Sequence, residues 1–292
     1  MSTSDTPGRL RAGGIDVGYE TRKVISQLDV TIPDGSFSVI IGPNACGKST
    51  LLRALSRLLK PSAGSVLLDG RDVHEFGGKQ FAREIGLLPQ QSLAPDGITV
   101  VDLVSRGRFP YQKLFKQWTD DDEQAVRTAL QSTRLLDLAQ RQVAELSGGQ
   151  RQRVWIAMAL AQQTPILLLD EPTTYLDLAH QLEVLELCAS LNADGRTLVA
   201  VLHDLNQAAR YATHLIAMRS GAIVAEGPPS QVVTAANVEA VFGVRARVID
   251  DPETGTPMVV PLASGAVHSA KLPGDTANLH ESGAGSPAAT NV

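Results

Sequence analysis

The chain has 292 residues, 43% of them hydrophobic and 20% charged, so it can bury a sizeable core in one large domain or two lobes. A formal net charge of -5 argues against a nucleic-acid-binding surface, which is normally basic. No apolar run approaches the roughly eighteen residues that span a bilayer. Two cysteines give no disulfide framework. Because residues 1–14 lack the apolar core of a signal peptide, we expect a cytoplasmic protein.

Short strands dominate the pattern from Arg9 to about Asp72, and Asp69 with Gly70 indicates a tight turn. Within this region, Ser38–Ile41 has the composition of a buried strand. Leucines at helical spacing from Leu51 to Leu59 indicate a helix that Pro61 terminates. The strand and the helix are joined by a glycine-rich loop.

This loop fits the G-x-x-x-x-G-K-[ST] spacing of a phosphate-binding loop. Its residues are Gly42, Pro43, Asn44, Ala45, Cys46, Gly47, Lys48, Ser49 and Thr50. Strand, loop and helix N-terminus together point backbone N–H groups and the positive helix end at an anion. We expect Lys48 to reach the β- and γ-phosphates of ATP and the Ser49 hydroxyl to ligate Mg²⁺. A thiol near a helix N-terminus can have a lowered pKa, so Cys46 is expected to react with a maleimide unless phosphate covers it.

From about Ser92 to Ala161 the pattern becomes helical. Thr119 and Asp122 have the spacing of a capping box before a run of apolar residues. A second glycine turn follows at Leu146–Gln150, and Val154–Ala161 has the pattern of the helix that this turn opens. Four arginines are expected to be solvated charges, with contact to a membrane subunit as the alternative. They are Arg106, Arg108, Arg151 and Arg153.

Two apolar strands follow, and each ends in residues that suit phosphate chemistry. Ile166–Leu169 leads into Asp170 and Glu171, and Thr197–Leu202 leads into His203. Asp170 is expected to support Mg²⁺, and Glu171 to position or deprotonate the attacking water. A histidine at a strand end is more often structural, but after the acidic pair and the phosphate loop we expect His203 to contact the γ-phosphate.

With these motifs in this order, the chain resembles the nucleotide-binding subunit of an ABC transporter from about Leu10 to Leu262. The resemblance implies an α/β P-loop fold with a mixed β core, an antiparallel β subdomain and an inserted helical subdomain. The expected ATPase domain spans 8–262, with the helical subdomain at about 92–161 and a β-hairpin at about 244–261. The remaining 263–292 is rich in small and polar residues and is expected to be disordered.

The family also implies roles for the second glycine turn, whose residues Ser147, Gly148, Gly149 and Gln150 form the signature motif. In the family they grip the γ-phosphate of ATP held by the other subunit, so one chain must form a head-to-tail homodimer. Tyr19 matches the aromatic that stacks on adenine, although an ordinary strand aromatic is the alternative. Gln90 matches the Mg²⁺-contacting glutamine, with Gln91 as the alternative register. Asp177 ends the loop that crosses the dimer and is counted with the nucleotide-binding residues.

The finer resemblance concerns the cargo. Residues 171–183 and 203–211 are similar to ATPases of the iron–siderophore, haem and vitamin B12 importer branch, and 248–261 is similar to ferric-enterobactin-type importers. This similarity implies two transmembrane permease subunits, an extracytoplasmic siderophore-binding protein, and a peripheral position at the cytoplasmic face of the membrane. No residue of these segments contacts a siderophore, so the cargo follows from the resemblance alone.

Haem or vitamin B12 remain alternative cargoes. A soluble ABC ATPase acting on DNA or ribosomes is a second alternative. Such proteins carry a long coiled coil or two cassettes in one chain, and this sequence has neither. A P-loop kinase or switch GTPase is a third alternative, which the signature motif argues against.

Overall fold

The computed structural model describes residues 8–20, 22–90, 94–112, 118–174 and 176–262. The expected disorder of 263–292 and the alternative glutamine Gln91 lie outside these described residues. The fold up to Pro261 forms one compact unit. Within the described ranges, every helix is too short or too polar to cross a bilayer.

The centre of the fold is a six-stranded sheet. Its strands, in spatial order, are β10 (Ala222–Gly227), β9 (His214–Arg219), β3 (Phe37–Ile41), β8 (Thr197–Val201), β7 (Ile166–Asp170) and β6 (Ile85–Leu88). All neighbouring pairs are parallel except β9 with β10. Every residue of β3, β7 and β8 is buried, which fits the continuous apolar runs in the sequence.

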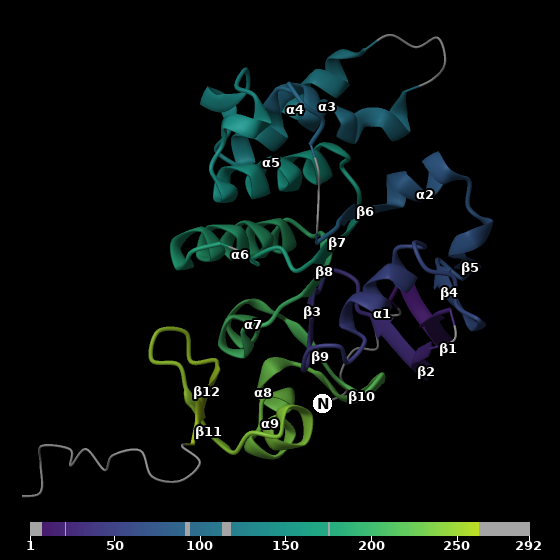
Figure 1. Cartoon of the computed structure of the whole chain (residues 1–292), viewed down its shortest axis with the longest axis vertical. Coiled ribbons are helices and arrows are strands. Elements are labelled where there is room, and N and C mark those ends of the chain that lie inside the picture. The colour runs from purple at the N-terminus through teal and green to yellow at the C-terminus, as the bar shows by residue number, and fades with distance from the viewer. Residues whose placement is uncertain (1–7, 21, 91–93, 113–117, 175, 263–292) are drawn as a thin grey trace, which may run out of the picture. The chain divides into compact units, whose positions relative to one another are not determined.

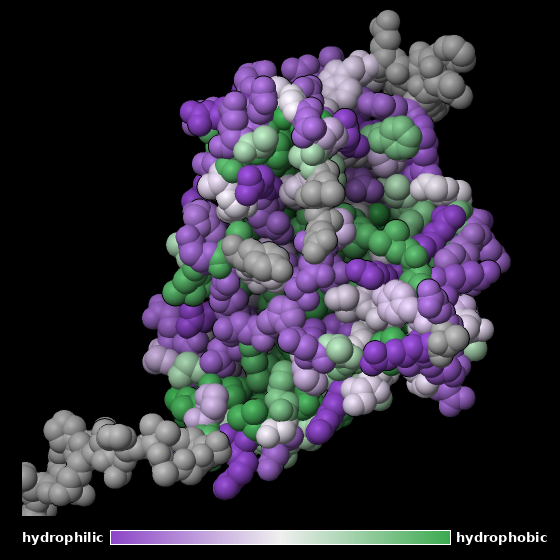
Figure 2. All heavy atoms as spheres, in the orientation of Figure 1, coloured by the Kyte–Doolittle hydropathy of each residue, from purple (hydrophilic) through white to green (hydrophobic). Residues whose placement is uncertain are grey.

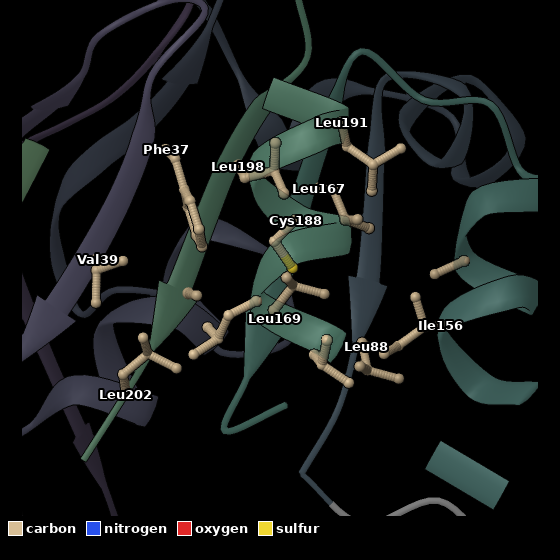
Figure 3. Close-up of a cluster of buried hydrophobic side chains, with 14 of the residues drawn as sticks. Phe37, Val39, Leu88, Ile156, Leu167, Leu169, Cys188, Leu191, Leu198 and Leu202 are labelled. Atoms are coloured by element: carbon tan, nitrogen blue, oxygen red, sulfur yellow. The ribbon is translucent and has the colours of Figure 1, made fainter. Parts of the chain in front are cut away.

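Alternate residues of these strands face two separate cores. On one face, Val39 and Leu169 pack with helices α5 (Gly148–Ala161), α6 (Leu178–Ala193) and α7 (Leu205–Tyr211). Figure 3 shows this cluster, with Cys188 of α6 among the leucines. On the other face, Ile40 and Leu168 pack with helix α1 (Lys48–Leu55) and with a second sheet. In Figure 1, α6 and α7 lie on one side of the strands and α1 on the other.

The second sheet is antiparallel. It contains, in spatial order, β2 (Arg22–Ile32), β1 (Leu10–Tyr19), β4 (Ala63–Leu68) and β5 (Arg71–Asp72). Asp69 and Gly70 both have positive φ, at 53° and 79°, so they form the predicted tight turn between β4 and β5. A mixed central sheet, an antiparallel sheet and flanking helices confirm the predicted α/β fold class.

Helix α1 is shorter than the leucine pattern predicted. It ends at Leu55 rather than near Pro61. Leu58 lies beyond its end and is 64% exposed. Arg57 takes a positive φ of 63°, so the backbone leaves the helical conformation before the last two leucines of the run.

The segment between β6 and β7 is helical. The helices between β6 and β7 are α3 (Val100–Ser105), η2 (Arg106–Tyr111), α4 (Asp120–Ser132), η3 (Leu136–Leu138), η4 (Val143–Glu145) and α5. Two further helices, η1 (Val73–Glu75) and α2 (Gly78–Glu84), precede β6. Thr119 and Asp122 form the predicted capping box at the start of α4. The helix that follows the second glycine turn begins at Gly148, earlier than the predicted Val154.

The prediction that Arg108 is a solvated charge is wrong. Its side chain is buried, and its Nε donates a 2.8 Å hydrogen bond to Oδ1 of Asp122, which is buried too. Its Nη1 donates to the carbonyl oxygen of Ala161 at the end of α5. Arg108 therefore ties η2, α4 and α5 together, and the same carboxylate serves the capping box.

After β10 come α8 (Pro229–Val232), α9 (Ala235–Phe242) and an antiparallel hairpin of β11 (Ala246–Asp250) and β12 (Pro257–Pro261). The β-hairpin expected at about 244–261 is therefore present. Asn206 of α7 binds both the N–H and the carbonyl of Val259, and Arg210 pairs with Asp251 at 2.6 Å. Figure 2 shows the hydrophobic side chains of the visible face as separate patches between hydrophilic ones.

Because Asp122 pairs with Arg108, removing its carboxylate should destabilise the fold far more than removing the neighbouring carboxylate of Asp121. Asp122→Ala leaves a buried guanidinium unpaired and removes a helix cap, so it should lower the free energy of unfolding by about 3 kcal/mol. Asp121→Ala, at the adjacent exposed position, should change it by less than about 0.5 kcal/mol. Urea unfolding followed by circular dichroism measures both; equal effects would contradict the structural role of the pair.

Candidate functional site

The glycine-rich loop joins β3 to α1, as predicted. Gly47 caps α1 with a left-handed backbone, φ 110°, and no side chain accepts from the first N–H groups of the helix. Lys48 is buried, and its Nζ donates to the carbonyl oxygens of Gly42 and Pro43 at 2.8 and 3.0 Å. These bonds hold the ammonium group over the loop, and the open N–H groups and the lysine together provide a binding surface for phosphate.

Glycine is required at position 42 by a close backbone approach. A Cβ there would lie 2.2 Å from the carbonyl oxygen of Met218 on β9 and 2.8 Å from the sulfur of Cys46. The backbone also has φ 150°, a conformation that side chains rarely allow. The loop is therefore anchored against the sheet, and its shape is fixed before any nucleotide binds.

Ser49 and Asp170 meet across 121 residues of sequence. The Ser49 hydroxyl donates a 2.9 Å hydrogen bond to Oδ1 of Asp170, the last residue of β7. Burial raises the pKa of Asp170, while the Ser49 bond opposes that rise and the nearby Glu171 carboxylate adds to it. One hydroxyl and one carboxylate beside a phosphate-binding loop fit Mg²⁺, which proteins hold by one or two side chains together with substrate phosphates.

Glu171 follows β7 in a left-handed backbone conformation, with φ 54°. Its Oε2 accepts hydrogen bonds from Nε2 of Gln90 at 2.7 Å and from the hydroxyl of Thr174 at 3.0 Å. Its Oε1 lies 2.8 Å from Nε2 of His203. Three residues from separate segments thus converge on this carboxylate, and a strained backbone in such a cluster is a feature of functional sites.

Two of these three neighbours were predicted from the sequence, Gln90 and His203, and the structure brings both to Glu171. Thr174 was not predicted. The available signal was its position three residues after Glu171, in a tight turn that returns toward the strand end. The Thr174 backbone N–H also bonds to the Glu171 carbonyl oxygen, at 3.3 Å, which fixes this turn.

Gln90, Glu171 and His203 line one open cavity of about 660 Å³ together with the phosphate loop. Its walls include Asn44, Ala45, Gly47, Lys48, Ser49, Thr50, Gln90, Glu171, His203, Tyr19, Arg22 and Val24. Tyr19, 42% exposed, stands at the wall of the cavity at the end of β1, where an aromatic ring can stack on a base. Its hydroxyl accepts a hydrogen bond from Arg53 of α1.

The expected reactivity of Cys46 is contradicted by its surroundings. The thiol is only 4% exposed and belongs to the core cluster under α1. Burial raises the pKa of the Cys46 thiol, and this effect outweighs the opposing charge of Lys48. The Cys46 side chain therefore packs in the core, and it is not among the residues that line the cavity.

The signature motif lies at the start of α5, and its side chains cap that helix. The Ser147 hydroxyl accepts from the Gln150 N–H at 3.3 Å, and Gln150 Oε1 accepts from the Ser147 N–H at 3.0 Å. Gly148 and Gly149 are the first two helical residues, so N–H groups of the helix start surround the turn. None of these four residues lines the cavity around Lys48 in the described chain.

Asp177 begins the next helix in the same way. Its carboxylate accepts from the His180 N–H at 3.0 Å and caps α6. Its side chain is 66% exposed and lies outside the cavity. The structure therefore gathers the phosphate loop, Tyr19, Gln90, Asp170, Glu171 and His203 in one place, and leaves Asp177 and the signature residues elsewhere on the same chain.

A buried lysine over a phosphate loop and a clustered carboxylate at the strand ends define a P-loop nucleotide hydrolase. The comparisons identify the family. The family model described as ABC transporter matches residues 25–174. The ferric enterobactin transport ATP-binding protein FepC of Escherichia coli is 54% identical over 91% of this chain and 99% of its own length. The chain belongs to the ATP-binding subunits of ABC transporters, and it is an ABC-type ATPase.

Two further proteins extend the comparison. The iron(3+)-hydroxamate import ATP-binding protein FhuC of Bacillus subtilis is 47% identical over 84% of this chain and 91% of its own length. The bacterial ABC transporter cassette MJ0796 has a dimeric structure with a TM-score of 0.67 and 29% identity, covering 75% of this chain and 98% of that one. A second dimeric structure of MJ0796, in a post-hydrolysis state with ADP and Pi, has a TM-score of 0.66 at 28% identity and the same coverage.

We expect Glu171→Gln to keep ATP binding and to lower the hydrolysis rate by roughly 10² to 10⁴. An amide oxygen can still accept from Gln90 and Thr174, but an amide cannot take a proton from water. ATP should then hold a dimer, which light scattering with and without ATP measures. Glu186→Gln, an exposed change on α6, is the control. A Glu171→Gln chain that stays monomeric at saturating ATP would count against a shared site.

For Cys46 we expect slow labelling by maleimide in the folded chain. A raised pKa lowers the thiolate fraction about tenfold per unit, and burial blocks access. Cys188, whose burial raises its pKa to about 12, should behave in the same way. Mass spectrometry should find both thiols unlabelled in native buffer and labelled in denaturant. Rapid labelling of Cys46 that ATP slows would restore the interpretation that this thiol faces the nucleotide.

Proposed function

We propose that this chain hydrolyses ATP to drive import of an iron(III)–siderophore complex through two separate permease subunits. In this assembly it is peripheral, at the cytoplasmic face of the membrane, and an extracytoplasmic binding protein delivers the cargo. The observation that supports an iron–siderophore cargo is 54% identity, along nearly the whole length, to a ferric enterobactin transport ATP-binding protein. Haem and vitamin B12 are the alternative cargoes, and a soluble non-transport ATPase is a less favoured alternative.

The chemistry follows from the cavity residues. The loop N–H groups and Lys48 hold the phosphates, and Tyr19 stacks on the adenine ring. Ser49, Asp170 and Gln90 would hold Mg²⁺. When bound, this ion supplies positive charge to the β- and γ-phosphate oxygens.

Glu171 orients the attacking water and accepts its proton, and His203 faces the γ-phosphate from the end of β8. In the present arrangement, Gln90, Thr174 and His203 all engage the Glu171 carboxylate. Gln90 donates to Glu171 through Nε2, so its Oε1 would be the atom available to Mg²⁺, and this one side chain would link the base to the metal site.

The proposed working form is a head-to-tail homodimer. The signature residues do not line the cavity of their own chain, although their exposed N–H groups and the Ser147 hydroxyl suit a γ-phosphate. A second chain can supply this surface, and the dimeric structures of MJ0796 support such an arrangement. Asp177 would then lie at the dimer contact.

The permease contact is proposed at the helical region around η2. A groove there of about 540 Å³ is lined by Arg106, Phe109 and Trp118. Phe109 is 62% exposed and Trp118 44%, which is unusual for rings of this size and suits a protein contact. For Arg106, which is exposed, we therefore favour contact with a membrane subunit, whereas Arg108 is buried.

Ser147→Arg tests the shared site. A bulky cation at the signature blocks the γ-phosphate contact from the second chain, so hydrolysis should fall at least roughly 10²-fold. ATP affinity of the isolated chain should stay within about twofold, because its own cavity is intact. Fluorescent-nucleotide titration and phosphate release measure the two quantities. Affinity that falls in step with rate would place the signature on the nucleotide of its own chain.

Iron uptake in cells that lack the gene tests the cargo. Uptake of ferric enterobactin or a ferric hydroxamate should disappear, and the wild-type gene and the Asp121→Ala gene should restore it. The Glu171→Gln gene should not. Loss of haem or vitamin B12 uptake instead would identify one of the alternative cargoes. Normal uptake of all of these would overturn the import proposal.

A further inference from the structure

The signature turn and the segment after Glu171 meet at one histidine of the same chain. A Cβ at Gly149 would lie 2.8 Å from Cδ2 of His180, so the imidazole ring packs directly on the backbone of this signature glycine. His180 belongs to the first turn of α6, and Gly149 to the first turn of α5. The starts of the two helices are therefore in contact through this ring.

The other side of the ring faces Asp177. Nδ1 of His180 lies 2.6 Å from Oδ1 of Asp177, and the His180 backbone N–H bonds to the same oxygen. Hydrogen bonds from His180 lower the pKa of Asp177, so the carboxylate stays charged. One imidazole thus touches the signature glycine on one edge and holds the Asp177 carboxylate on another.

The segment between Glu171 and Asp177 is bound to the same two helices at further points. Gln152 of α5 donates to the carbonyl oxygen of Pro172 at 3.0 Å. Gln181 of α6 donates to the carbonyl oxygen of Leu176 at 3.0 Å. These two bonds connect α5 to Pro172, the residue after Glu171, and α6 to Leu176, the residue before Asp177.

We propose that His180 is a positioning residue that couples the two ATP sites of the dimer. The inference rests on the proposed head-to-tail arrangement. In that dimer, the signature of one chain contacts ATP on the other chain, while Glu171 of the first chain acts on its own ATP. His180 joins these two parts of a single chain, so closure of one site on its γ-phosphate positions the base of the other.

The test compares two substitutions of His180, each of which keeps one of its two contacts, with Gly149 or with Asp177. His180→Asn keeps a donor near the Nδ1 position for Asp177 and removes the ring from Gly149. His180→Phe keeps a ring against Gly149 and removes the donor. Glu186→Gln, exposed on the same helix, is the matched control. The full-length chain is assayed for ATP affinity, for kcat and for the Hill coefficient of hydrolysis against ATP concentration.

The wild type and Glu186→Gln should show a Hill coefficient above 1, up to about 2 for two coupled sites. Both His180 variants should lower the Hill coefficient to about 1. His180→Phe loses one hydrogen bond to a charged group and should lower kcat about tenfold, and His180→Asn should lower kcat because the ring contact with Gly149 is lost. ATP affinity should change by less than about twofold, because His180 does not line the cavity. This separation of kcat from affinity distinguishes positioning from general damage to the fold.

A cooperative wild type with His180 variants that remain cooperative would overturn the role of His180 and leave the shared site standing. A wild-type Hill coefficient of 1 would overturn the coupling itself. The Ser147→Arg result then decides separately whether the shared site fails as well.

Discussion

Parallel pairing of β3, β8 and β7 is the constraint on which the site depends. In the observed register Ile40 pairs with Val201, and Val201 pairs with Asp170. Each strand therefore ends at the same edge, and the residues just beyond each strand enter one cavity: the phosphate loop, Glu171 and His203. A slip of one residue would turn the side chains of a strand to the opposite core and break both apolar clusters. The packing of the sheet thus fixes the chemistry.

That arrangement places unfavourable features together. Burial raises the pKa of Asp170, and the neighbouring Glu171 carboxylate adds to that rise. Glu171 and Ala45 have left-handed backbones with φ 54° and 60°. Such features persist only where the surrounding structure determines them. Here the fully buried strands on both sides of the site provide that support. Nucleotide phosphates add the negative charge that Lys48 and the helix N-terminus favour, so the loop is preorganised for its ligand.

Much of this site could be predicted because its signals are local. Each motif can be recognised within about ten residues: a strand followed by a glycine loop, and an apolar run followed by two acids. Contacts between distant segments could not be predicted in the same way. Arg108 lies in a polar stretch, and only the fold shows that it pairs with Asp122 and reaches the end of α5. Cys46 is a second example, because its sequence position indicates nearness to phosphate while its side chain is buried in the core.

Ser147 combines an observed structural role with a proposed functional one. As an N-cap, Ser147 accepts from the Gln150 N–H, and aspartate or asparagine would cap the helix equally well. An aspartate would repel a γ-phosphate, whereas a hydroxyl that accepts from the backbone keeps its own proton to donate. Asp177 caps α6 at a position where its charge lies outside the phosphate cavity. Capping alone would permit either residue at either helix, and the proposed contact of Ser147 with the γ-phosphate of a second chain accounts for an uncharged cap at α5.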